Sequence, residues 1–129
     1  MVTALYAVIL AGLLISLAWQ VIKQRRAELI KYADGGVEAL VLARSAHGNA
    51  VDYIPITLIL MALAEYNGVH VGFIHLAGIA FVIGRVLHAK AILSDTLKHR
   101  ITGMKLTFLV MAALMVLNLI ALPYSKLLG

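Results

Sequence analysis

Four long apolar stretches separated by short polar segments dominate the chain. The first, residues 1–22, has no charged side chain and would form a helix of roughly 33 Å, enough to cross a hydrocarbon layer of about 30 Å. We expect the other spans at residues 37–66, 69–93 and 104–122. No strand-like alternation and no internal repeat competes with this pattern. The chain is therefore predicted to be all-α: an integral membrane four-helix bundle that forms a single domain over residues 1–129.

The connectors carry signals that end one helix before the next begins. Asp34–Gly36 precedes the second span, Asn67 and Gly68 precede the third, and Pro123 follows the fourth. Pro55 falls inside the second span, where a proline removes one backbone hydrogen bond and can kink a helix. The first apolar stretch is followed rather than preceded by basic residues, so we expect a retained helix and not a cleaved signal peptide.

Composition places the chain in a bilayer. Of its 129 residues 63% are hydrophobic and 13% are charged, against about 25% charged in an ordinary globular domain. The net charge is +5, but the basic residues lie beside apolar segments, which favours anionic lipid headgroups over nucleic acid as partners. The chain has no cysteine, so any thiol chemistry would need an imported thiol.

The basic residues also predict an orientation in the membrane. The first and third connectors and their borders are rich in Lys and Arg, while the second connector has none. Because such residues are retained on the cytoplasmic side, both termini are predicted to lie on the non-cytoplasmic side. Lys126 is the one basic residue that opposes this orientation.

Polar side chains should converge where the start of the second span, the end of the third and the start of the fourth meet at the cytoplasmic face. Charges at this depth are costly unless they are paired or hydrated. At 100° per residue, Asn49, Asp52 and Tyr53 fall within a sector of about 100°. Asp52 could pair with an ammonium group, Asn49 could bind an amide, and nearby cations could bind carboxylates. The converging residues are Arg44, His47, Asn49, Asp52, Tyr53, Arg85, His88, Lys90, Lys98, His99, Arg100 and Lys105.

Three motifs in these segments resemble a known family. HGNAVDYIP in the second span, GRVLH in the third and HRITGM before the fourth are similar to the membrane-associated proteins in eicosanoid and glutathione metabolism, called MAPEG. The resemblance extends to MVTALYAV at the start and DGG before the second span, and it is closest to small bacterial members. It implies a left-handed four-helix bundle that forms a homotrimer in the inner membrane, with glutathione bound between neighbouring subunits near the cytoplasmic face.

The resemblance also implies roles for individual residues. Asn49, Asp52 and Tyr53 match glutathione-binding positions, and Arg85 and His88 match positions that line the pocket. Arg100 matches the arginine that stabilises the glutathione thiolate and is the expected catalytic residue. A thiol with a pKa of about 8.5 is mostly protonated at neutral pH, so an adjacent guanidinium would lower that pKa and supply the nucleophile. No metal is expected to take part.

Two positions depart from the family pattern. Ser45 stands where members often carry an arginine, and Arg44 lies one residue earlier. Arg44 is expected either to reach the ligand site with its long side chain or to pair with Asp52. The tyrosines that conjugating members place late in the third span are absent, since no tyrosine occurs between Tyr66 and Tyr124. The purely structural alternative for Asp52 is an ion pair with Arg44 or Arg85.

These observations favour a glutathione-dependent membrane transferase or peroxidase that acts on a hydrophobic small molecule. The alternatives are a MAPEG-fold protein without catalytic activity and a small proton-coupled exporter that loads protons and cations on Asp52. A b-type haem protein with His47 and His88 as axial ligands is a further alternative, although no pattern around the two histidines supports it.

Overall fold

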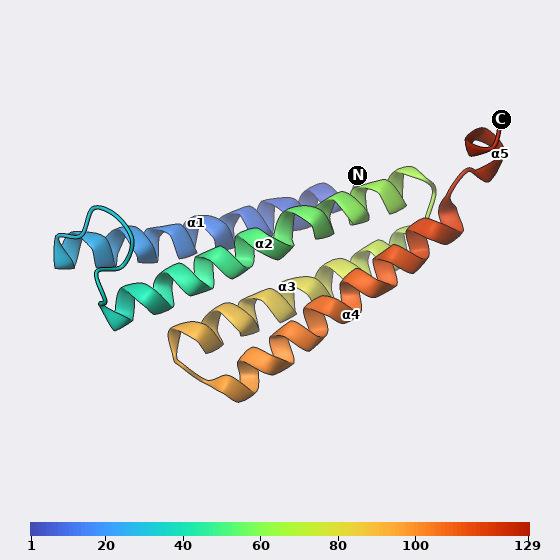
Figure 1. Ribbon diagram of the computed structural model, residues 1–129. Coiled ribbons are helices and arrows are strands. Elements are labelled where there is room, and N and C mark those ends of the chain that lie inside the picture. Colours follow the sequence, from blue (N-terminus) through green and yellow to red (C-terminus); the bar gives the residue numbers. More distant parts are fainter.

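The computed structural model describes residues 1–129 and is entirely helical (Figure 1). Its helices are α1 (Thr3–Glu28), α2 (Glu38–Tyr66), α3 (Val71–Leu93), α4 (Leu97–Ala121) and a short α5 (Tyr124–Leu127). The first four are each long and apolar enough to cross a membrane. The prediction of an all-α chain with four apolar helices is confirmed, and the arrangement is compatible with a four-helix membrane bundle.

The helices pack so that α2 and α3 occupy the middle of the bundle. α2 and α3 contact each other, and each also contacts both α1 and α4, whereas α1 and α4 do not touch. The α1–α2 and α3–α4 connectors lie at one end of the molecule, and the N-terminus, the α2–α3 connector and the C-terminal segment lie at the other (Figure 1). The predicted polar residues of the second and third spans therefore sit on the two central helices.

Two helices extend beyond the predicted spans. α1 continues past residue 22 to Glu28, and α4 begins at Leu97 rather than near Met104. An apolar run marks the hydrocarbon layer, but α1 continues outside it because the Lys, Gln, Arg, Ala and Glu residues at 23–28 are good helix formers. α2 runs through Pro55 without interruption.

Small residues let α3 approach its neighbours closely. A Cβ on Gly103 of α4 would lie 2.8 Å from the Cβ of His88 and 2.9 Å from the carbonyl oxygen of Gly84. A Cβ on Gly78 would lie 2.6 Å from ring atoms of Tyr6. These contacts bring α4 and α1 against opposite parts of α3, as small residues do at helix crossings in membranes.

At the N-terminal end of α1, Glu65 of α2 binds the first helical turn. Its carboxylate accepts hydrogen bonds from the backbone N–H of Val2 and Thr3, the latter at 2.8 Å, and from the Thr3 hydroxyl at 2.6 Å. The first N–H groups of a helix have no partner within the helix, and a carboxylate near them also interacts favourably with the helix dipole. Glu65 thus fastens α1 to α2.

Replacing Glu65 with alanine should therefore destabilise the bundle by about 1–3 kcal/mol, the usual cost of leaving buried donors unpaired. Thermal unfolding in detergent measures the change. Glu28→Ala provides the matched control, because Glu28 is exposed at the end of α1 and makes no hydrogen bond or ion pair. Equal unfolding temperatures for the two variants would contradict the proposed role of Glu65.

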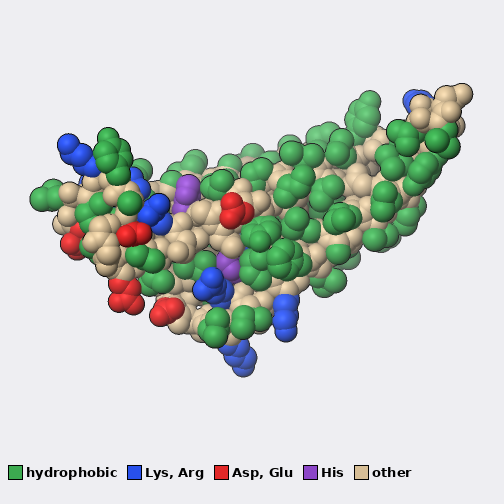
Figure 2. Space-filling view, viewed as in Figure 1, with side chains coloured by type: hydrophobic (Ala, Val, Ile, Leu, Met, Phe, Trp, Pro, Cys, Tyr) green, Lys and Arg blue, Asp and Glu red, His purple; other side chains and the backbone are tan.

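Charge marks one end of the molecule. Lys and Arg side chains gather around the end that holds the α1–α2 and α3–α4 connectors, while hydrophobic side chains cover the length of the helices (Figure 2). This distribution agrees with the basic connectors in the sequence.

A topology reporter fused after Gly129 is predicted to respond only on the non-cytoplasmic side, and a cytoplasmic signal would contradict the orientation.

Candidate functional site

The buried side chain of Arg85 is the centre of a polar cluster on the central helices. This charged side chain is 0% exposed and lies within the membrane helix α3. One guanidinium nitrogen, Nη2, donates to Oδ1 of Asn49 at 2.5 Å, while Nη1 lies 3.4 Å from Oγ1 of Thr107 and 3.6 Å from Sδ of Met104. The guanidinium carbon lies 5.7 Å from the centre of the Tyr53 ring, in cation–π geometry. All these partners are neutral, and no carboxylate of the protomer forms an ion pair with the guanidinium.

His88 lies one turn after Arg85 and is 1% exposed. Its Nδ1 is 3.4 Å from Nη2 of Arg85. Two buried nitrogens of this pair, Nε2 of His88 and Nε of Arg85, have no hydrogen-bond partner. Such groups are rare in folded proteins, and each costs about 1–3 kcal/mol. A cluster of this kind is typical of a functional site rather than of a structural core.

The structure brings part of the predicted α2 face to this cluster. Asn49 and Tyr53 both contact Arg85, and the Tyr53 ring packs edge-to-face on Phe108 of α4, with ring centres 5.5 Å apart. Asp52 lies on the exposed side of the same helix and forms no ion pair. The structural alternative for Asp52, an ion pair with Arg44 or Arg85, is therefore not formed within the protomer.

Arg44 pairs with a different carboxylate from the expected one. Its Nη1 lies 3.0 Å from Oδ2 of Asp34, and both side chains are partly exposed. The α1–α2 connector turns back over the start of α2, since the N–H of Val37 bonds to the Asp34 carbonyl and the N–H of Gly36 bonds to the Asp34 side chain. This local fold brings Asp34 within reach of Arg44, so the alternative in which Arg44 pairs with Asp52 is wrong.

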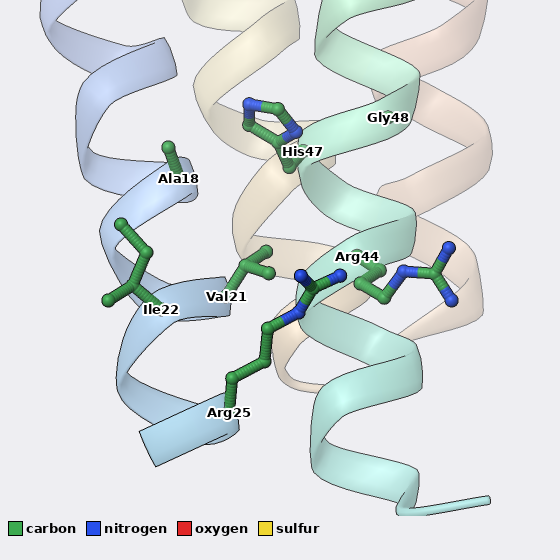
Figure 3. A pocket seen from close by; sticks show the side chains of 7 residues that line it. All are labelled: Ala18, Val21, Ile22, Arg25, Arg44, His47 and Gly48. Atoms are coloured by element: carbon green, nitrogen blue, oxygen red, sulfur yellow. The ribbon is translucent and has the colours of Figure 1, made fainter. Parts of the chain in front are cut away.

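A hollow of about 400 Å³ lies between α1 and α2 near the basic end. Arg25 reaches into it from α1, while His47 and Arg44 project from α2 (Figure 3). Arg25 also donates to the carbonyl of Lys31 at 3.1 Å, which ties the connector to α1. The hollow therefore offers the guanidinium of Arg25 and the imidazole of His47 on a face separate from the Arg85 cluster, while the guanidinium of Arg44 is held by Asp34 and points away from α1 (Figure 3). The remaining lining residues are Ala18, Val21, Ile22 and Gly48.

Arg100 stands in the first turn of α4 and is exposed at the basic end. Its side chain makes no hydrogen bond or ion pair within the protomer. Lys98 and His99 are exposed beside it, and the turn contains no acidic residue. Cations at a helix N-terminus are unfavourable with the helix dipole, so an anion bound here would relieve their repulsion.

Three residues of the Arg85 cluster and of the hollow were not predicted from the sequence. Thr107 and Met104 contact Arg85 from α4, and Arg25 lines the hollow. A polar threonine inside an apolar span was the available signal for Thr107, but a single polar residue is a weak one. Arg25 was assigned to a connector, because the helical extension of α1 lies beyond the apolar run.

Comparison with known sequences gives consistent matches over nearly the whole chain. A family profile described as "MAPEG family" matches residues 3–120. The chain is 36% identical over 125 residues to "Inner membrane protein YecN" of Escherichia coli strain K12, covering 97% of this chain and 95% of that protein. The protein of the same name from Escherichia coli O6:H1 matches to the same extent.

Proposed function

The chain belongs to the MAPEG family, and from this premise we propose that it is a glutathione-dependent membrane enzyme, a transferase or peroxidase for a hydrophobic small molecule. Four apolar helices and the similarity to an inner-membrane protein support a multi-pass location in the inner membrane. Glutathione would bind near the basic end, as a co-substrate that supplies the thiol that the cysteine-free chain does not have.

One observation carries this proposal: Asp52 lies near the middle of a membrane helix, exposed and in no ion pair within the protomer, one turn from the residues that contact the buried Arg85. An uncompensated carboxylate in a membrane helix costs about 2.5–3.5 kcal/mol. An ammonium group of a ligand would remove that cost. A peptide with one amine and two carboxylates matches a surface that offers one free carboxylate beside several arginines.

The site is proposed to be completed by a second copy of the chain in a homotrimer. The exposed Asp52 and the hollow lined by Arg25 and His47 lie on different sides of α2, since positions 47 and 52 are about 140° apart on a helix. In a closed ring, each interface joins one surface of a protomer to a different surface of the next. A cyclic trimer can therefore place the cationic hollow of one copy opposite Asp52 of its neighbour, so that the hollow binds the carboxylates of glutathione and Asp52 binds its ammonium group.

In this proposal Arg100 stabilises the thiolate. The thiol proton leaves to solvent, and the guanidinium compensates the negative charge that develops on sulfur. In conjugation the sulfur electron pair forms a bond to an electrophilic carbon, and the leaving group departs with its bonding pair. In peroxide reduction the thiolate attacks the terminal oxygen of a hydroperoxide, an alcohol leaves, and a second glutathione releases the disulfide and water. The apolar helix surfaces give the hydrophobic substrate access from the bilayer.

Asp52→Asn tests the proposed site, because it removes the charge and keeps the shape. We expect glutathione binding to the detergent-purified protein, measured by calorimetry, to weaken about tenfold or more. Asp95→Asn is the matched control, since Asp95 is exposed in the α3–α4 connector with φ of 53°, which asparagine tolerates. Equal affinities for the two variants would exclude Asp52 from the site.

A further inference from the structure

Arg85 restricts what its neighbours can offer to a ligand. A guanidinium carries five N–H donors and no acceptor. Any amphoteric side chain that bonds to it must therefore turn an acceptor towards it. Asn49 and His88 are both amphoteric, since each side chain can donate through one atom and accept through another, and both bond to the same nitrogen, Nη2.

This contact determines the orientation of the Asn49 amide. The bond of 2.5 Å uses Oδ1 of Asn49 as the acceptor. The opposite orientation would place two N–H groups against the guanidinium, which is repulsive. The side chain of Asn49 is half-buried, and its Nδ2 makes no hydrogen bond within the protomer. The group of Asn49 that remains free for a ligand is thus Nδ2, which carries two N–H donors.

The same reasoning determines the tautomer of His88. Nδ1 faces Nη2 of Arg85 at 3.4 Å, so it must be the acceptor and the ring hydrogen must lie on Nε2. Nε2 is the buried atom without a partner. The imidazole, like the amide, therefore turns a donor away from Arg85.

We infer that Arg85 is a positioning residue that sets the polarity of the ligand site. It turns the amide donors of Asn49 away from itself, so the group of the ligand received at Asn49 is an acceptor, a carbonyl or carboxylate oxygen, while Asp52 is left as the acceptor for the ammonium group. This inference rests on the proposed function and adds the direction in which a zwitterionic peptide lies along α2. A site with a freely rotating amide could accept the ligand in either direction.

Asn49→Asp separates this role from a merely structural one. The carboxylate keeps the acceptor that Arg85 requires and adds an opposite charge, but it removes the outward donors. Thermal unfolding and glutathione calorimetry are measured on wild type, Asn49→Asp and Asn49→Ala. We expect Asn49→Asp to unfold at or above the wild-type temperature and to bind glutathione about tenfold or more weakly. Asn49→Ala is expected to lose both stability and affinity.

Each other outcome is decisive. Wild-type affinity in Asn49→Asp would show that the donors of Asn49 do not contact the ligand. An Asn49→Asp protein less stable than Asn49→Ala, or unable to fold, would show that Asn49 does not turn its oxygen to Arg85. Absence of glutathione binding in the wild type would overturn the proposed function alone, because the unfolding temperatures would still test the orientation of Asn49.

Discussion

Replacing Arg100 with alanine should lower the rate of glutathione conjugation by about a hundredfold, the usual effect of removing one group that stabilises a developing anion. The side chain is exposed and makes no hydrogen bond or ion pair within the protomer, so the loss is not expected to come from unfolding. The rate is measured with a small aromatic halide as the electrophile, at saturating glutathione. Glutathione affinity should change much less than the rate, because the binding contacts are assigned to α2 and α3.

Lys98→Ala is the matched control for this experiment. Lys98 is an exposed cation in the same helical turn, and its removal changes the local charge by the same amount. We expect Lys98→Ala to have a rate near that of the wild type. Equal losses in the two variants would mean that only the general positive potential matters, and no loss in either would exclude Arg100 from the chemistry.

Gly103→Ala should strongly destabilise the bundle. Its Cβ would lie 2.9 Å from both the backbone nitrogen of His88 and the carbonyl oxygen of Gly84, and backbone atoms cannot move aside as a flexible side chain can. Overpacking of this kind costs about 1–3 kcal/mol or more. The crossing of α3 and α4 also supports Arg85 and His88, so glutathione binding should weaken together with the unfolding temperature.

The same substitution at Gly12 should act in the opposite direction. Gly12 lies within α1, and a Cβ there would meet no atom within 4 Å. Alanine in an open helical position is favoured over glycine by about 0.5–1 kcal/mol. Thermal unfolding of both variants in the same detergent provides the comparison. A similar effect of the two changes would contradict the close approach of α3 and α4.

Hydropathy was sufficient to predict the four apolar helices, because every backbone group in a bilayer must find its partner within a helix. It was not sufficient to predict where the helices end. The extension of α1 to Glu28 and the early start of α4 at Leu97 lie in polar sequence, where helix formation depends on propensity and not on apolarity. The extension matters, since it turns Arg25 from a connector residue into part of the hollow between α1 and α2.

Helical periodicity predicted that Asn49, Asp52 and Tyr53 share one face, but it could not assign their partners. The sequence places several cations near Asp52, and only the path of the connector shows that Arg44 is occupied by Asp34. The depth of Arg85 and its contacts with Asn49 and Thr107 depend on the packing of three helices. Tertiary contacts of this kind leave no periodic signal in a single sequence.

The most direct test of the central claim is the ultraviolet absorbance of a thiolate when glutathione is added to the purified wild-type protein at neutral pH. We expect a saturable thiolate signal, because a free thiol with a pKa of about 8.5 is mostly protonated under these conditions and the site is proposed to hold the ionised form. The signal should be absent in Arg100→Ala at the same glutathione concentration. Absence of any thiolate signal in the wild type at saturating glutathione would contradict the claim that this protein activates glutathione.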